Sequence, residues 1–367
     1  MRIVVNDIAA SKTGALSVLK DFYKYVLEHD KENEWIFVLG DKLLEERDNI
    51  RIVVRSDVKA GWLNRLKFDL INGGKYLMSF EPDVVFSLQN TMPASVLVKK
   101  VLYVHQPLGF QRQKNFSLFK GAERHLAIYQ HFISRLIDAS IKKADKTIVQ
   151  TKWMEDAITK KTGVKPEKIR RILPDINVPR LERILSDNKF EALSEKDFFY
   201  PASNIIYKNH SCIMEAVKLL KERNVSGFSV SFTLEKTDAC DFPYYDKFNE
   251  VHYLGSIDRD EVFLRYKKGT LLFPSYIETF GYPPAEARAV KGLVLASDCD
   301  FSREVLNEYD NAYYFNPFDP VELADCMEKV IKGDIVNKYK DYCVADNTDT
   351  CSTAVSWEQV VEEIISG

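Results

Sequence analysis

The stretch FPSYIETFGYPPAEARAVKG, residues 273–292, places two glutamates, Glu278 and Glu286, eight positions apart around a turn that contains one Gly and two Pro. The apolar run TLLFPS (270–275) predicts a buried strand before the turn. Pro283 and its neighbour predict a helix after it, because proline fits the first helical turn without losing a hydrogen bond. Core packing has no use for two carboxylates here, whereas a site that grips hydroxyl groups does, since each carboxylate accepts two or more hydrogen bonds.

The same turn predicts an anion site. The first backbone amides of a helix point outward with the positive end of the helix dipole, so those of Thr279, Phe280, Gly281 and Tyr282 would suit a diphosphate. A surface loop whose acids only stabilise the helix N-terminus is the alternative.

Working outward, short apolar runs alternate with helical periodicity over the whole chain, which is typical of strand–helix units around parallel sheets. Its 367 residues suffice for two domains. In the first half, we expect strands at 2–5, 35–40, 50–54, 83–88 and 100–107. We expect helices at 14–29 and 151–163, and at 134–151 a helix that runs into a strand. The second half repeats the alternation with strands at 198–203, 228–234, 251–257, 270–275 and 292–297 and helical segments at 210–224, 259–269 and within 311–333.

Between the halves, RRILPDINVP (170–179) has two Pro and no long periodicity, so it predicts a linker. We expect an α/β protein with two doubly wound domains and a ligand at the carboxyl ends of their strands.

Composition excludes several classes. No run of 18 apolar residues appears, the N-terminus lacks the apolar core of a signal peptide, and six scattered cysteines have no metal-like spacing, so we expect a cytoplasmic protein with reduced thiols. The net charge of −3 is unevenly distributed along the chain, because residues 99–171 hold 17 Lys and Arg against 6 Asp and Glu. Such a region is either a solvated helical face or a surface for anionic lipid or a phosphate-bearing acceptor, and no nucleic-acid module accompanies it.

The opening stretch resembles the signature of the family-4 retaining glycosyltransferases, which have the GT-B fold of two facing Rossmann-like domains with an interdomain cleft. Its spacing of Pro-Ser, Glu278, the Gly-containing turn, Glu286 and a following Gly matches the family pattern, and LASDCDFSREVL (295–306) resembles the family's next segment. The resemblance implies that Glu278 holds hydroxyls of a donor sugar and that Glu286 holds the ribose of a nucleotide. The base would then lie near Tyr253 to Ser256, with Leu254 as its contact.

The resemblance also implies a phosphate clamp, from which this chain departs. The family carries Gly-Arg and, five residues after the Arg, a Lys followed by Gly or Asn. Here Lys208 and Asn209 stand at the expected positions, but Ala202 and Ser203 replace Gly-Arg. One of two usual cations is therefore missing, and Ser203 can offer only a hydrogen bond. Arg303 is the candidate to compensate.

In the first half, the resemblance implies that Gly14 marks a phosphate-facing or acceptor-facing helix start and that His105, directly after a strand, lines the reaction centre. A single His is more often structural. The aromatic and basic residues between 110 and 146 suit a protein that reaches a lipid-anchored acceptor at a membrane surface, although such aromatics can equally face the core.

Two Asp-x-Asp triplets, at 258–260 and 298–300, lie outside the half in which a metal-dependent transferase fold would need them, so we expect no metal. The absence of G-x-G-x-x-G after the first strand argues against a dinucleotide dehydrogenase.

We therefore expect an acceptor-binding domain at 1–178, a nucleotide-sugar-binding domain at 179–350 and a C-terminal helix at 351–367 that returns to the first domain. The expected activity is retaining, metal-independent transfer of a hexosyl unit from a nucleotide diphosphate sugar, UDP- or GDP-linked, with no cofactor. The glycan acceptor would be a polyprenyl-diphosphate-linked one of bacterial surface polysaccharide synthesis, at the inner face of the membrane. The alternatives are a non-catalytic nucleotide-sugar binder and an epimerase or phosphorylase of the same fold.

Overall fold

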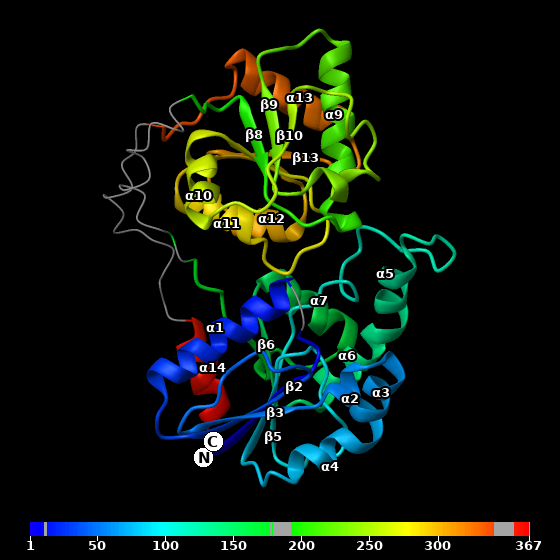
Figure 1. Cartoon of the computed structure of the whole chain (residues 1–367), viewed down its shortest axis with the longest axis vertical. Helices are drawn as coiled ribbons and strands as arrows, with labels where there is room; N and C mark the ends of the chain where they lie inside the picture. The colour runs from blue at the N-terminus through cyan, green and yellow to red at the C-terminus, as the bar shows by residue number, and fades with distance from the viewer. Residues whose placement is uncertain (11–12, 177, 179–191, 341–355, 367) are drawn as a thin grey trace. The chain divides into compact units, whose positions relative to one another are not determined.

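The computed structural model describes residues 1–10, 13–176, 178, 192–340 and 356–366. The chain divides into two compact units, Met1–Asp175 with Ala354–Gly367, and Ile176–Thr353 (Figure 1). Each unit is built on one parallel sheet, as the alternation of strands and helices predicts.

The first unit holds a seven-stranded sheet in the order β3-β2-β1-β4-β5-β6-β7, in which every pairing is parallel. The strands are β1 (Arg2–Asp7), β2 (Glu34–Leu39), β3 (Ile50–Val54), β4 (Val84–Ser87), β5 (Lys99–Tyr103), β6 (Lys146–Val149) and β7 (Ile169–Arg171). The larger helices are α1 (Thr13–His29), α6 (Ser134–Lys143), α7 (Lys152–Thr162) and α14 (Ser356–Ile365). Shorter helical segments are α2 (Ser56–Lys59), α3 (Trp62–Lys67), η1 (Phe68–Asn72), α4 (Gly73–Met78), α5 (Arg124–Ile128), η2 (Tyr129–Ile133) and η3 (Pro166–Lys168).

Alternation along β1 divides the core of this unit. Ile3 and Val5 face a cluster that includes α1 and α14, whereas Val4 faces a second cluster that includes α6 and α7. Because both faces of the sheet are covered, its strands are nearly continuous in apolar residues. The strand order reverses between β1 and β4, so the loops after these two strands flank the position at which such sheets bind ligands.

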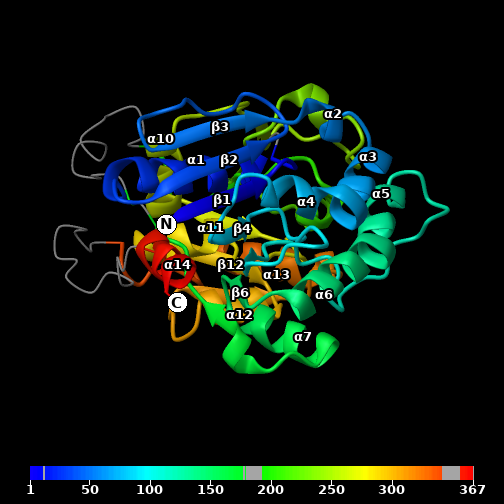
Figure 2. The same cartoon turned by 90° about the horizontal axis from the view of Figure 1, so that it is seen from below.

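The C-terminal helix α14 belongs to the first unit. It lies beside α1 (Figures 1 and 2) and contributes Trp357, whose ring stands 5.2 Å from that of Phe22 and 5.9 Å from that of Tyr103. At its start, the Ser356 hydroxyl donates to Asp175 at 2.9 Å. The last helix therefore closes part of the core that α1 covers.

The second unit holds a six-stranded parallel sheet in the order β10-β9-β8-β11-β12-β13, and the order reverses between β8 and β11. The strands are β8 (Asp197–Tyr200), β9 (Ser229–Phe232), β10 (Val251–Tyr253), β11 (Thr270–Phe273), β12 (Leu293–Ser297) and β13 (Ala312–Phe315). The helices are η5 (Ile206–Lys208), α9 (His210–Glu222), η6 (Lys236–Ala239), α10 (Arg259–Lys268), α11 (Tyr282–Ala289), α12 (Asp300–Val305) and α13 (Pro320–Lys332).

Several features differ from the sequence prediction. The expected linker is wrong at its start, because Ile169–Arg171 form β7 and pair with β6, and three residues are too few to show a strand period. The helical segments from Ser56 to Met78 were not predicted. The unit boundary lies between Asp175 and Ile176, where the sequence suggested 178, and residues 351–355 of the expected last helix lie outside the described part.

Candidate functional site

The strand order of the second unit brings together the loops that follow β8 and β11. These loops, 201–209 and 274–281, leave the carboxyl ends of adjacent strands at the point where the order reverses, which is where parallel sheets bind ligands. The second-unit residues predicted for the site lie in these loops or at the first residue of the helix that follows, with the exceptions of Leu254 and Glu286.

Lys208 and Glu278 meet across these loops. The Lys208 Nζ donates to Glu278 Oε1 at 2.5 Å, and both side chains are largely buried, with exposed fractions of 19% and 15%. The Ser275 hydroxyl donates to the same carboxylate oxygen at 2.7 Å. In the described part of the chain, the second oxygen of Glu278 accepts no hydrogen bond, so it has capacity for a ligand hydroxyl.

Asn209 shows why the residue after the lysine is restricted. Its φ of 64° lies in the left-handed region, which Gly and Asn tolerate best. Its side-chain amide donates to the carbonyls of Pro274 at 3.1 Å and Pro317 at 2.7 Å, so it ties together the loops after β8, β11 and β13. Both amide hydrogens are committed to this framework, and only the amide oxygen remains for a ligand.

The turn before α11 has the form that the sequence predicts. Gly281 takes a φ of +87° at the N-terminus of the helix, and two prolines follow Tyr282 in the first turn. Phe280 is buried and meets the ring of Tyr282 at 5.4 Å, which fixes the turn. The predicted amides of Thr279 to Tyr282 therefore lie at the start of α11, beside the loop that carries Glu278.

Glu286 is more enclosed than the sequence suggests. It is 6% exposed on α11, accepts from the Tyr266 hydroxyl at 3.2 Å and pairs with Arg259 at 2.9 Å, both from α10. Burial raises the pKa of its carboxyl, and the neighbouring Arg259 acts against that rise. A ribose bound by Glu286 would have to share this carboxylate with Arg259, a residue that the sequence analysis did not single out.

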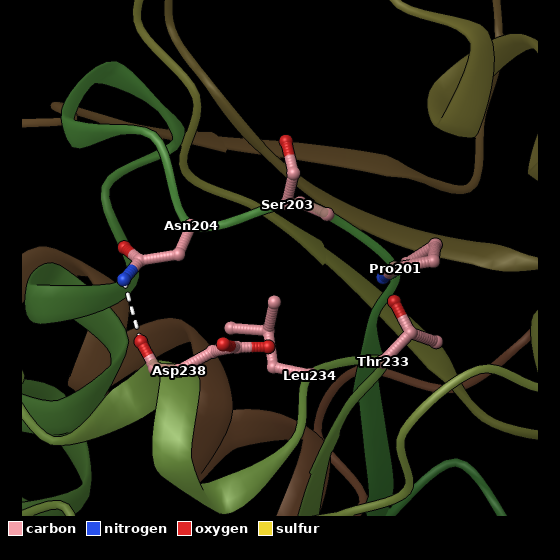
Figure 3. A pocket seen from close by; sticks show the side chains of 7 residues that line it. Pro201, Ser203, Asn204, Thr233, Leu234 and Asp238 are labelled. Atoms are coloured by element: carbon pink, nitrogen blue, oxygen red, sulfur yellow. Dashed lines mark hydrogen bonds between the residues drawn. The ribbon is translucent and has the colours of Figure 1, made fainter. Parts of the chain in front are cut away.

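A cavity of about 580 Å³ lies at the carboxyl ends of β8 and β9. It is lined by residues of the loops after both strands, namely Pro201, Ala202, Ser203, Asn204, Thr233, Leu234 and Asp238 (Figure 3). The Asn204 side chain donates to the Asp238 carbonyl at 2.5 Å and links the two loops, while the Ser203 hydroxyl points away from that link. Leu254 lies one strand further on, where its amide donates to the Phe232 carbonyl at 2.9 Å.

Arg303 does not supply the missing cation. Its guanidinium forms two bonds to Asp298, at 2.7 and 2.9 Å, and lies over the Tyr314 ring at 3.6 Å. The charge of Arg303 is therefore neutralised by Asp298, one of the acids of the 298–300 triplet. Among the described residues, no group of three or more His, Cys, Asp or Glu could hold a metal ion.

In the first unit, the predicted residues follow β1 and β5. Gly14 lies in the first turn of α1, and a Cβ there would meet no atom within 4 Å, so the position does not require glycine. His105 follows β5; its backbone amide donates to Asn90 Oδ1 at 2.7 Å and its ring meets that of Tyr103 at 5.6 Å. Burial lowers the pKa of His105 to about 4, so the imidazole is neutral near pH 7.

Sequence reasoning missed a buried polar group at the switch point of the first sheet. Asp7 ends β1 at 2% exposure, and burial raises its pKa to about 7, against the opposing charge of Arg65. Nearby, the Asp69 carboxylate accepts from the Thr91 hydroxyl at 2.9 Å and from Arg65 at 3.2 Å. The Gln89 side-chain oxygen is buried without a partner in the described part of the chain. The sequence signal for Asp7 was the polar pair Asn6-Asp7 directly after the apolar run at 3–5.

Comparisons with known proteins show which sequences and folds this chain resembles. The family model "Glycosyl transferases group 1" matches residues 183–344, which cover most of the second unit. The O-antigen chain mannosyltransferase RfbU of Salmonella typhimurium is 25% identical over 229 residues, which are 60% of this chain and 61% of that protein.

Three solved structures share the fold over nearly the whole chain. WaaG, a glycosyltransferase involved in lipopolysaccharide biosynthesis, matches with a TM-score of 0.69 at 14% identity and covers 100% of both chains. Sucrose-phosphate synthase from Thermosynechococcus elongatus matches at 0.68 and 13%, covering 99% of this chain and 98% of that one. Anabaena HepE in complex with UDP-glucose matches at 0.67 and 14%, covering 99% of both chains.

These findings confirm the predicted GT-B fold and the predicted resemblance to glycosyltransferases, among them proteins of polysaccharide assembly. More particularly, the second unit carries a glycosyl transferases group 1 domain, in which Lys208, Glu278 and Glu286 all lie. The chain spans 61% of the length of the curated relative that it matches.

Proposed function

We propose that this protein transfers a hexosyl unit from a nucleotide diphosphate sugar to a glycan acceptor, with retention of anomeric configuration and without a metal. The observation that supports the donor site is the Lys208–Glu278 pair at the switch point of the second sheet. It sets a cation for the diphosphate next to a carboxylate for the sugar hydroxyls, and the amides at the start of α11 lie beside both.

In this proposal the protein works by positioning and electrostatic stabilisation. Lys208 and the amides from Thr279 to Tyr282 would stabilise the charge that grows on the departing diphosphate. Glu278 would fix the sugar hydroxyls, and Glu286 the ribose, so that the anomeric carbon meets the acceptor in one orientation. The neutral His105 could accept or donate one hydrogen bond without bringing a charge.

The first unit would bind the acceptor. Two observations support a lipid-linked acceptor: the curated relative is named as an O-antigen chain transferase, and residues 99–171 carry 17 Lys and Arg against 6 Asp and Glu. We propose that this region also contacts an anionic membrane from the cytoplasmic side. No helix in the described ranges is long and apolar enough to cross a bilayer.

The test is release of nucleotide from UDP-, GDP- and dTDP-sugars, measured with and without EDTA. A glucosyl and a mannosyl donor come first, because a structural neighbour is in complex with UDP-glucose and the curated relative is named as a mannosyltransferase. EDTA-resistant release from one donor, lost in Glu278→Gln and kept in the exposed control Glu222→Gln, is the expected result. The anomeric configuration of the product, read by NMR, tests retention.

A non-catalytic nucleotide-sugar binder is the second candidate. Ser203 replaces a cation of the phosphate clamp, and Arg303 is held by Asp298, which favours this alternative. Binding of one donor by calorimetry, with no release of its nucleotide even when acceptors are supplied, would select this candidate over the transferase.

A further inference from the structure

The loop that leads into α5 exposes large apolar side chains within a basic region. Phe119 is 94% exposed and Leu118 is 37% exposed, whereas Phe116, three residues earlier, is 3% exposed. Residues 111–143 contain seven Lys and Arg and two acids. A phenylalanine that meets only water is unusual, because burying such a ring is among the largest single gains in folding.

This exposure belongs to an ordered loop. The Glu123 carboxylate accepts from the Ser117 amide at 2.9 Å and pairs with Lys114 at 3.1 Å. The Gln130 side chain accepts from the Phe116 amide at 2.9 Å and donates to the Lys114 carbonyl, also at 2.9 Å. These bonds hold both sides of the loop, and the chain before α5 projects away from the sheet (Figures 1 and 2). The exposed Phe119 therefore lies in a loop whose backbone is held by hydrogen bonds.

The helical stretch that follows also exposes apolar and basic side chains. Its exposed side chains recur every three or four residues, as on one face of a helix, and these are Arg124, Ile128, Phe132, Arg135, Ala139 and Lys142. Ile128 is 41% exposed and Phe132 is 52% exposed. Within the described residues, the three cations of this face form no ion pair, while Asp138 is held by Lys161 at 2.8 Å.

We propose that Leu118, Phe119 and this helical face together form a docking surface for an anionic phospholipid bilayer. Exposed aromatic and aliphatic groups among unpaired cations, without a free acid, match the interfacial region of a membrane, where rings enter the headgroup layer and cations meet lipid phosphates. Nucleic acid would account for the cations but not for the exposed aliphatic side chains Leu118 and Ile128, and an acidic protein partner would give no binding to anionic vesicles. The inference rests on the membrane contact of the proposed function and names the residues that make it.

The experiment is co-sedimentation of the full chain with vesicles of phosphatidylcholine alone or mixed equally with phosphatidylglycerol. The wild type should bind the mixed vesicles and release them in high salt. Phe119→Ser should weaken partitioning about tenfold, and Arg135→Glu should weaken it about as much. Val336→Ser, which changes a 50% exposed residue of the second unit, should bind like the wild type.

Circular dichroism of each variant shows that folding is intact, and because vesicle binding needs no turnover, its failure is separable from failure of the transferase proposal. Wild-type binding without preference for the anionic vesicles would overturn the proposal. So would unchanged binding of Phe119→Ser and Arg135→Glu. Loss of binding in Trp62→Ser alone, at a 70% exposed residue of α3, would place the contact elsewhere and overturn it as well.

Discussion

Replacing Lys208 by Met tests the central pair of the donor site. Lys208 and Glu278 are 2.5 Å apart, and each side chain is more than four-fifths buried, so removal of the cation leaves a largely buried carboxylate with Ser275 as its remaining donor. Breaking a fully buried pair costs about 3–5 kcal/mol, and this pair retains some solvent contact, so we expect a loss of about 2–3 kcal/mol. For a unit of this size, the midpoint of thermal unfolding should fall by about 4–12 °C.

The same variant should bind a nucleoside diphosphate poorly. A charge-assisted hydrogen bond contributes about 1.5–3 kcal/mol, so the dissociation constant should rise by roughly 10- to 150-fold. Isothermal titration calorimetry with UDP and GDP measures this change. Lys218→Met is the matched control, because Lys218 lies on α9, away from the loops of the site, where it pairs with Glu215 and Glu222 and lies over the Tyr244 ring.

A double-mutant cycle separates the pair from its two members. Glu278→Gln should be less harmful in the presence of Lys208→Met than in its absence, since the unpaired charge is then gone, with a coupling of about 1–2 kcal/mol. Additive effects on unfolding, together with wild-type affinity of Lys208→Met for both nucleotides, would refute the assignment of Lys208 to the diphosphate.

Three further outcomes follow from the structure. Ser203→Arg should tighten UDP or GDP binding several-fold, about 3- to 10-fold by calorimetry; no change would place the diphosphate away from the loop after β8. Glu286→Gln loses the pair with Arg259, which is 55% exposed, so the free energy of unfolding should fall by about 1 kcal/mol or less, while donor hydrolysis falls at least about tenfold. If the loss of hydrolysis were no larger than the loss of stability accounts for, Glu286 would have a structural role only. Burial raises the Asp7 pKa from 3.8 to about 7, so the folded chain keeps a proton that the unfolded chain releases, and stability should decline as pH rises from 4 to 7. Urea unfolding of Asp7→Asn should lack up to ~4 kcal/mol of that decline, and identical pH profiles would contradict the raised pKa.

Much of the fold was predictable because its signals are local. Buried parallel strands are short apolar runs, and Gly163, at a φ of 71°, ends α7 where the sequence indicates a stop. The segments from Ser56 to Met78 were missed because two residues of their inner face are polar or lack a side chain, Asp69 and Gly73, while Leu70 and Ile71 face solvent. A pattern that exposes leucine and buries aspartate cannot be read by periodicity alone.

The sequence could predict which residues belong to the candidate site but not which of them form ion pairs. The eight-residue spacing around the turn selected Glu278 and Glu286, and the family resemblance selected Lys208. It could not show that Lys208 and Glu278 bind each other, since they are 70 positions apart and meet only through the crossing order of β8 and β11. Nor could it show that Arg259 reaches Glu286 from α10.

These pairings bear on how a clamp with one cation fewer can bind a doubly charged ligand. Each carboxylate that the opening stretch places near the turn pairs with a cation, Glu278 with Lys208 and Glu286 with Arg259. Sugar and ribose hydroxyls that donate to those carboxylates leave the negative charge of the carboxylates in place. The diphosphate therefore meets cations that are already compensated, and the local field is less positive than in a site with two uncompensated cations. Binding would then depend more on hydroxyl recognition than on charge. A donor sugar should therefore outcompete its bare nucleoside diphosphate here by a wider margin in wild type than in Ser203→Arg, a ratio that competition calorimetry measures directly.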